Sequence, residues 1–335
     1  MKHLVSAAAA TAVIGALLLA FLELNLAEVG QGVADRLRAL SPQLLGLAFA
    51  FYLASYFGRA WRLAILIPGL RGMVQLASIA ARHNFLNLVL PFRTGELSLP
   101  WMLSREYGRT LAEGGAALLV CRILDLLCVT AYLALGMAWY GVGGSSAEHV
   151  GIRVAGVLVS LAVIIPIMSP LAKKMSKRLE TDSGGRLRRF LAQATGHLAC
   201  MSLRQLASAT LVSLGTWGLT YTTYYFMVQA MSGPDPIGQQ LGDIAFSRSL
   251  VGTTGLHLST VLPVNTLGGI GTWETGWVGG YTLLAGLSKQ AAGISGVMSH
   301  LINFAFITVL ATAGYLLRKK PLTSAEAPVQ QNEAD

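Results

Sequence analysis

The chain has 335 residues, of which 53% are hydrophobic and only 12% are charged, and its mean hydropathy is +0.57. Charged residues are about half as frequent as in ordinary soluble domains, which excludes that class and indicates a membrane protein. The formal net charge of +9 suggests nucleic-acid binding at first sight. However, the basic residues lie mainly at the ends of apolar runs, so we expect no nucleic-acid partner.

Six apolar runs are each long enough to cross the hydrocarbon core of a bilayer, which requires about 20 helical residues. In chain order they are 4–22, 44–67, 113–140, 150–171, 206–231 and 291–317. The first run resembles a secretory signal, but Glu23 and Glu28 follow it and no small-x-small cleavage site is evident. We therefore predict an uncleaved first span.

Two further apolar stretches, 76–103 and 245–286, are interrupted by helix-breaking residues. The first contains Pro91 and Pro100, and the second contains Pro263 and the run Gly268-Gly269-Ile270-Gly271. Irregular backbone is tolerated at membrane depth only where protein or a water-filled cavity satisfies it. Both stretches are thus predicted to be broken helices or re-entrant hairpins in an all-α, polytopic membrane protein.

Lysine and arginine are distributed unequally between the two predicted sides. One side has sixteen: Lys2, Arg71, Arg82, Arg105, Arg109, the eight from Lys173 to Arg204, and Arg318 to Lys320. The other side has Arg36, Arg38, Arg153 and Lys289. Because basic residues are retained in the cytoplasm, this asymmetry predicts that both termini are cytoplasmic.

The predicted elements fall into two units. Residues 1–141 contain two spans, a hairpin and a span, and residues 150–317 repeat this order in the opposite orientation. The basic linker 172–205 is expected to contain an amphipathic helix that lies on the inner leaflet and contacts anionic phospholipids. We assign residues 1–320 to a single membrane domain and expect the polar tail 321–335 to be disordered.

A set of polar residues occurs once in each unit with the same spacing. The intervals are 26 residues and then 3 residues in both sets, which are Glu96, Arg122 and Asp125 in the first unit and Glu274, His300 and Asn303 in the second. Duplicated polar residues in an apolar chain are typical of transporters built from inverted repeats, whose binding site lies near the bilayer midplane.

The charged pairs Arg93/Glu96 and Arg122/Asp125 have a spacing of three residues, which puts the members of each pair on one helix face. A lone ionisable residue at the centre of a spanning helix costs about 2.5–3.5 kcal/mol, so these side chains are expected to point inward. Two interpretations remain open. Either the pairs neutralise each other and hold the helices together, or they form a cavity that receives a charged headgroup.

Neighbouring residues bear on that choice. His300 and Asn303 replace Arg122 and Asp125 in the second unit, and Arg248 adds a cation, so the combined site is expected to be basic. Gly269 and Gly271 allow close backbone approach. Arg59 and Arg62 are expected to extend to lipid headgroups, with a functional role as the alternative. The aromatic stripe is expected to pack and anchor at the interface rather than to form a ligand cage; it consists of Trp217, Tyr221, Tyr224, Tyr225 and Phe226. His83, Asn84 and Asn87, and similarly His257, either line a cavity or cap a helix.

Several motifs resemble the lysylphosphatidylglycerol synthase transmembrane-region family, whose members are also called flippase-like membrane proteins. They are Asn87 to Glu96, Arg122-Ile123-Leu124-Asp125, and Leu262-Pro263 with Gly268 to Glu274. The resemblance covers about residues 40–317. It implies movement of lipids such as aminoacylated phosphatidylglycerol, hopanoids or polyprenyl-linked sugars across bacterial or archaeal membranes.

On that resemblance the family motifs map to Arg93 and Glu96, to Arg122 and Asp125, and to Gly269, Gly271 and Glu274. Two positions depart from the family pattern, Cys121 before Arg122 and the segment Val264-Asn265-Thr266 in the place of a second proline. The soluble aminoacyl-transferase domain of the synthases does not follow the final span, so we do not expect synthesis of lysyl lipid.

The leading hypothesis is a lipid transporter of the bacterial cytoplasmic membrane for anionic or zwitterionic headgroups. The expected substrate-binding residues are Arg93, Glu96, Arg122, Asp125, Arg248, Gly269, Gly271, Glu274, His300 and Asn303. We expect no catalytic residue, metal or other cofactor, and a protein partner or homo-oligomer remains possible. The alternatives are a membrane-embedded transferase that uses Glu96, Asp125 or Glu274 as base on a polyprenyl-phosphate donor, and a scaffold subunit.

Overall fold

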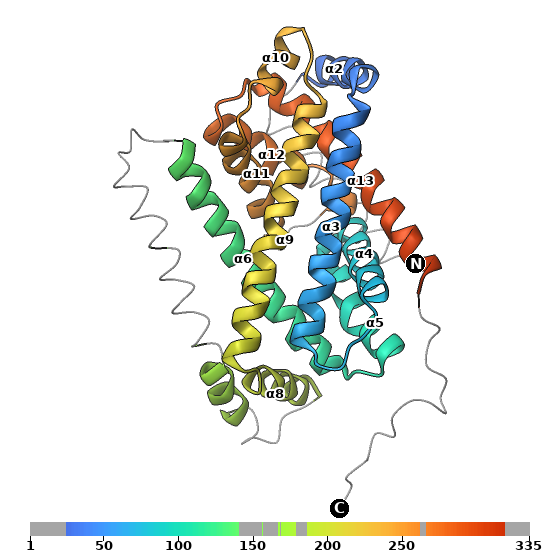
Figure 1. Cartoon of the computed structure of the whole chain (residues 1–335), viewed down its shortest axis with the longest axis vertical. Coiled ribbons are helices and arrows are strands. Elements are labelled where there is room, and N and C mark those ends of the chain that lie inside the picture. The colour runs from blue at the N-terminus through green and yellow to red at the C-terminus, as the bar shows by residue number, and fades with distance from the viewer. Residues whose placement is uncertain are drawn as a thin grey trace, which may run out of the picture.

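The computed structural model describes residues 25–140, 156, 167, 169–178, 186–261 and 266–318, and within these ranges every regular element is helical. Figure 1 shows long helices that run side by side, with shorter helices at both ends. The elements are α2 (Leu26–Ala39), α3 (Pro42–Leu66), α4 (Met73–Val89), η1 (Pro91–Leu97), α5 (Ser98–Tyr107), α6 (Leu111–Tyr140), α8 (Arg186–Ala199), α9 (Leu203–Ala230), α10 (Pro236–Gly242), α11 (Phe246–Val261), η2 (Leu267–Gly269), α12 (Thr272–Gly279), η3 (Gly280–Leu284) and α13 (Lys289–Leu316).

Four of the six predicted spans correspond to long helices, namely α3, α6, α9 and α13. By length and hydropathy, α6 and α13 are each sufficient to cross a membrane. A third candidate arises if Ala27–Ala39 and α3, which meet at 94°, are counted as one bent span. Span 4–22 and the tail 321–335 lie outside the described residues, as does most of span 150–171, so the number of spans stays a prediction.

Helix α9 is long but carries a row of hydroxyl side chains. Thr210, Ser213, Thr216 and Thr220 each donate a hydrogen bond of 2.7–2.9 Å to the carbonyl oxygen four residues earlier. All four side chains are buried. Internal donation satisfies the hydroxyls, so α9 can pack along α3 even though its hydropathy is lower than that of α6 (Figure 1).

The helix break predicted in the stretch 76–103 is present. Helix α4 ends at Val89, and Phe92 and Arg93 then adopt left-handed backbone angles, with φ of 53° and 56°. The chain returns along α5, where Arg82 binds Glu106 through two parallel contacts of 2.8 and 3.0 Å. This buried bidentate pair joins α4 to α5.

A corresponding break separates α11 from α12, although Pro263 and the rest of 262–265 lie outside the described residues. Gly271 has φ of +84°, a conformation that suits glycine, and it precedes the first turn of α12. The two helices touch closely, because a Cβ atom on Gly255 would lie 2.5 Å from the Gly276 carbonyl oxygen. A side chain at Gly255 would therefore separate them.

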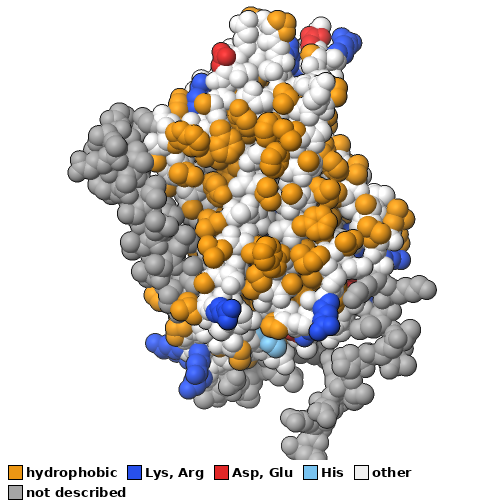
Figure 2. Space-filling view, in the orientation of Figure 1, with side chains coloured by type: hydrophobic (Ala, Val, Ile, Leu, Met, Phe, Trp, Pro, Cys, Tyr) orange, Lys and Arg blue, Asp and Glu red, His pale blue; other side chains and the backbone are white. Residues whose placement is uncertain are grey.

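The surface of the bundle is divided by polarity. Figure 2 shows hydrophobic side chains across the middle of the molecule, with most of the charged side chains at its two ends. The helix predicted in the linker is present as α8, and Leu198 at its end is buried in the same cluster as Ala172 and Met201. In Figure 1, the end of the bundle that carries α8 also carries α5, which contains Arg105, and the turn after α3, which contains Arg71, in agreement with the predicted charge asymmetry.

Helices α2 and α10 were not predicted from the sequence, and one ion pair connects them at the opposite end of the bundle. Arg36 binds the Asp235 carboxylate and donates a hydrogen bond of 3.1 Å to the carbonyl oxygen of Met231. Asp235 accepts hydrogen bonds of 3.1 and 3.0 Å from the backbone N–H groups of Ile237 and Gly238. The pair thus links α2, the end of α9 and the start of α10.

The backbone N–H of Gly238, together with Arg36, holds the pKa of Asp235 below its usual value. A carboxyl whose pKa is lower in the folded state stabilises the fold above its unfolded pKa, and this contribution is lost as the pH falls through the folded pKa. We expect the unfolding temperature of the wild type to fall on acidification below about pH 4. The unfolding temperature of the Asp235→Asn variant should fall less over the same pH range. An identical pH dependence of the unfolding temperature in the two proteins would contradict this role of Asp235.

Candidate functional site

A cavity of about 180 Å³ lies at the centre of the bundle, where both helix breaks meet α3, α9 and α13. Its walls come from both halves of the chain. The lining residues are Tyr52, Tyr56, Arg59, Asn84, Asn87, Leu88, Arg93, Trp217, Thr220, Tyr224, Leu256, His257, Gly269, Thr272, Trp273, Asn303 and Ile307. This set contains two arginines, and the described residues place no acidic side chain in the lining.

Arg59 provides one of the two positive charges of the cavity. Its guanidinium group lies 5.5 Å from the centre of the Tyr56 ring, and one nitrogen donates a long hydrogen bond of 3.5 Å to Thr220 Oγ1. The Nε atom is buried and has no hydrogen-bond partner. A buried charged donor without a partner is costly, so an acceptor that entered the cavity beside this Nε atom would offset that cost.

Arg93 provides the second positive charge and lies at the first helix break. Its partner within the protein is Glu96, at 3.5 Å from Nη1 to Oε1. The same carboxylate makes shorter contacts with Arg122. Arg93 is thus only partly neutralised, at a position that lines the cavity.

Aromatic rings form another wall of the cavity. The His257 ring meets Trp217 and Tyr224 edge-on, with centroid distances of 4.7 and 5.5 Å, and Trp273 lies 6.0 Å from Tyr224. Trp217 and Tyr224 of the predicted aromatic stripe therefore pack against their neighbours and also line the cavity, and their role in packing rather than in a ligand cage stays a prediction. Tyr221 is buried and bonds to Thr254.

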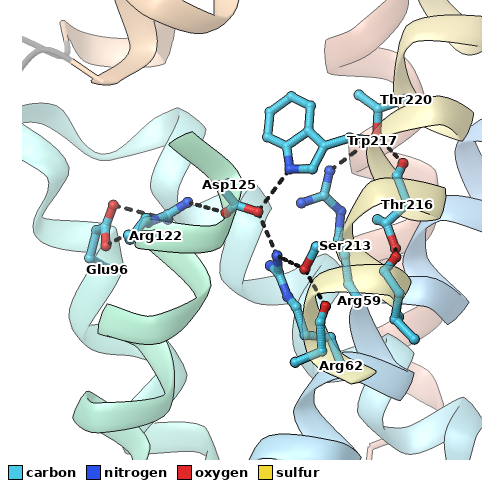
Figure 3. A network of polar contacts seen from close by, with 11 residues as sticks. Arg59, Arg62, Glu96, Arg122, Asp125, Ser213, Thr216, Trp217 and Thr220 are labelled. Carbon is cyan, nitrogen blue, oxygen red and sulfur yellow. Dashed lines mark hydrogen bonds and ion pairs between the residues drawn. The ribbon is translucent and has the colours of Figure 1, made fainter. Parts of the chain in front are cut away.

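A buried ionic network adjoins this cavity and is centred on Asp125 (Figure 3). Oδ1 of Asp125 is 2.5 Å from Arg62 Nη1 and accepts a hydrogen bond of 2.9 Å from Trp217 Nε1. Oδ2 lies 3.5 Å from Arg122 Nη1. Arg62 also donates to Ser213 at 3.2 Å. One carboxylate on α6 thus binds side chains of both α3 and α9.

This geometry corrects two expectations. Arg62 does not extend to lipid headgroups, because it is only 5% exposed and is bound to Asp125. Arg59 lines the central cavity instead of reaching the membrane surface. The principal partner of Asp125 is therefore Arg62 on another helix, and the predicted partner Arg122, three residues away, makes the longer contact.

Glu96 and Arg122 form a close pair at the first helix break. Nε and Nη2 of Arg122 lie 3.1 and 2.9 Å from the two carboxylate oxygens of Glu96 (Figure 3). This two-point contact fixes the orientation of both groups. It ties the end of η1 to α6.

Glu274 and His300 form the corresponding pair in the second half of the chain. His300 Nδ1 lies 2.6 Å from Glu274 Oε1, and His300 Nε2 lies 2.9 Å from the carbonyl oxygen of Gly268. A carbonyl oxygen only accepts, so Nε2 carries a proton. The short Nδ1–Oε1 contact then requires a second proton between histidine and carboxylate. The pair is therefore neutral as a unit, like Arg122 with Glu96.

The substrate-binding residues predicted from sequence fall into three groups. Arg93, Gly269 and Asn303 line the cavity. Glu96, Arg122, Asp125, Glu274, Gly271 and His300 lie in the pairs next to it, with the Gly271 N–H donating to Glu274 at 2.7 Å. Arg248 is elsewhere, because it donates to the Ala285 carbonyl oxygen at 2.5 and 3.0 Å and lies 5.5 Å from the Tyr140 ring.

Sequence reasoning missed Arg59 as a cavity residue, together with Tyr52 and Tyr56 on the same helix. Their spacing offers a signal, since positions 52, 56 and 59 are four and three residues apart and share one helix face. Asn84 and Asn87, for which both a cavity role and a capping role were open, line the cavity.

The network predicts the effect of removing one partner of Asp125. Breaking a buried ion pair by removing one member costs about 3–5 kcal/mol, because the other charge stays buried. Arg62→Met should therefore lower the unfolding temperature in detergent more than the double variant Arg62→Met with Asp125→Asn. The exposed Arg71→Met is the matched control. A double variant that is less stable than Arg62→Met alone would show that Arg62 and Asp125 act independently.

No curated protein matches the chain in sequence. The family model described as "Lysylphosphatidylglycerol synthase TM region" matches residues 6–311, which is most of the chain. The match includes both helix breaks, the Asp125 network and every residue that lines the central cavity. The chain is therefore a membrane protein that belongs to the lysylphosphatidylglycerol synthase TM region family.

Proposed function

We propose that this protein moves a lipid with an anionic or zwitterionic headgroup between the leaflets of the membrane, with the headgroup passing through the central cavity. The observation that carries the proposal is the charge of the lining, which includes Arg59 and Arg93 and no acidic side chain among the described residues. Two guanidinium groups in a site of low dielectric constant attract a phosphate or carboxylate strongly.

The other lining groups suit the remainder of a headgroup. The amides of Asn84, Asn87 and Asn303 and the hydroxyls of the tyrosines can donate to and accept from glycerol or sugar hydroxyls. A volume of about 180 Å³ admits a headgroup rather than a whole lipid. The hydrocarbon chains would therefore stay outside the polar cavity during passage.

A membrane-embedded transferase is the alternative function. It would need a free carboxylate to act as general base within reach of the substrate. Glu96, Asp125 and Glu274 are each bound to a cation or shared proton at 2.5–2.9 Å, and none of them lines the central cavity. This arrangement supports the transporter over the transferase.

The proposal includes two inverted repeats in a bacterial cytoplasmic membrane, with both termini in the cytoplasm. The matching pairs support the repeats, because Glu96–Arg122 and Glu274–His300 are both formed across an interval of 26 residues. The charge asymmetry supports the orientation. The basic helix α8 would then face the anionic phospholipids of the inner leaflet.

Transport by the purified chain in liposomes tests the function. Wild type should equilibrate fluorescent phosphatidylglycerol between leaflets without ATP. Arg59→Gln should slow this by about 10- to 100-fold, because a hydrogen bond to a charged group contributes about 1.5–3 kcal/mol. The same substitution should slow the transport of phosphatidylethanolamine less, since the headgroup of this lipid has no net charge.

Two variants serve as controls for this experiment. Arg59→Lys keeps the charge and should keep part of the transport, and Arg71→Gln makes the same change at an exposed arginine far from the cavity and should behave as wild type. Absence of transport of every lipid by a folded wild-type protein, with a glycosyl- or acyl-transfer product detected by mass spectrometry, would favour the transferase.

A further inference from the structure

A groove of about 110 Å³ runs between α3, α4 and the C-terminal part of α13. Helix α4 packs against both α3 and α13, and the three helices lie on one side of the bundle (Figure 1). The lining is almost entirely apolar and consists of Leu53, Tyr56, Phe57, Val74, Ala77, Ser78, Ala81, Leu310, Ala313, Gly314 and Leu317. Several of its side chains are open to the surroundings, including Phe57 at 40% and Leu317 at 55% exposure.

The groove adjoins the central cavity on all three of its helices. On α3, Tyr56 lines both spaces. On α4, Ala81 lines the groove and Asn84 the cavity, and on α13, Leu310 lines the groove and Ile307 the cavity. Residues three apart on a helix are neighbours on one face, with an axial rise of about 4.5 Å. The apolar groove therefore begins where the polar cavity ends.

The polar groups at this boundary are already satisfied within the protein. The Ser78 hydroxyl donates to the carbonyl oxygen of Gly314 at 2.6 Å. The Tyr56 hydroxyl bonds to Tyr52 at 3.2 Å and accepts from Asn84 at 3.3 Å, which directs its polar end toward the cavity. The groove thus offers apolar surface and no free hydrogen-bonding group among these residues, which suits a hydrocarbon chain.

We propose that this groove holds a hydrocarbon chain of the lipid whose headgroup occupies the central cavity. This inference rests on the proposed function and specifies the substrate as an amphiphile that binds in two parts. Small residues make room for the chain, because Ala77, Ala81 and Ala313 leave space that larger side chains would fill, while Gly314 allows α13 to approach the Ser78 backbone closely. The groove volume of about 110 Å³ corresponds to three or four methylene groups, if each takes about 30 Å³, the volume of a water molecule in the liquid.

Photo-crosslinking tests the groove directly. The probe is phosphatidylglycerol with a diazirine in the headgroup-proximal half of one acyl chain, and labelled peptides are identified by mass spectrometry. In the wild type, the segments that contain Leu310 to Leu317 and Val74 to Ala81 should be labelled. An excess of a short-chain phosphatidylglycerol should compete with this labelling, whereas labelling of other lipid-facing surfaces should be unaffected because those lipids are not held by a headgroup site.

Filling the groove provides the matched variants. Ala313 is exposed on α13, so Ala313→Trp should occupy the groove without disturbing the core and should reduce groove labelling by about tenfold. Ala305→Trp places the same side chain at another exposed alanine of α13 that lines neither space, and it should leave labelling unchanged. Transport of long-chain phosphatidylglycerol should likewise be slowed in Ala313→Trp and unchanged in Ala305→Trp.

The outcomes separate this inference from the proposed function. Equal labelling and transport in the two variants, or groove labelling that the short-chain lipid does not reduce, would overturn the groove as a chain site. If the wild type transports no lipid but its groove labelling is competed by the headgroup and lost in Ala313→Trp, the groove stands and the transport proposal fails.

Discussion

The buried carboxylate of Asp125 determines how positive charge is distributed inside this bundle. It neutralises Arg62 through a contact of 2.5 Å and is also bound by Trp217 and Arg122 (Figure 3). Arg62 and Arg59 lie three residues apart on α3, so one acidic group decides which of the two arginines is satisfied by the protein. Because Asp125 binds Arg62, Arg59 has no carboxylate partner among the described residues and faces the cavity.

The same distribution recurs at the two helix breaks. Glu96 lies closer to Arg122, at 2.9 Å, than to Arg93, at 3.5 Å, so Arg93 is only partly neutralised. In the second half of the chain, Glu274 and His300 form a pair that is neutral as a unit. The excess of positive charge therefore collects on the first half of the chain. The second half contributes aromatic and amide surface, mainly Trp273 and Asn303. On the proposed function, the first half would bind the acidic part of a headgroup and the second half its neutral part.

Residue types and spacings were sufficient to predict the helical class, four long helices and both helix breaks, because apolar length and helix-breaking residues act locally. The repeated interval identified Glu96, Arg122, Glu274 and His300 as one constellation, but the ion pairs predicted from the three-residue spacing, Arg93/Glu96 and Arg122/Asp125, are the longer contacts at 3.5 Å, and the close pair of Glu96 with Arg122 was not predicted. The Asp125–Arg62 pair was not predicted either, because its members are 63 residues apart and are brought together only by α9, which packs against both α3 and α6. The same packing turns Arg59 inward, whereas its position near the end of an apolar run suggested the membrane surface.

Arg248 was predicted at the site as an additional cation that would make it basic, but a cation within an apolar run needs only a partner. It finds that partner locally in the Ala285 carbonyl oxygen and the face of the Tyr140 ring, so no cavity is required to satisfy it. Helices α2 and α10 lacked a strong apolar pattern. Their positions depend on the capping of α10 by Asp235 and on the ion pair with Arg36.

The central claim is that the cavity selects an acidic headgroup through guanidinium groups that the protein leaves incompletely neutralised. Native mass spectrometry of the protein, purified in mild detergent from its own membrane, measures this most directly. The account predicts one retained lipid per chain, enriched in acidic headgroups relative to the bulk membrane extract. Retained lipids with the same headgroup composition as the bulk extract would contradict it.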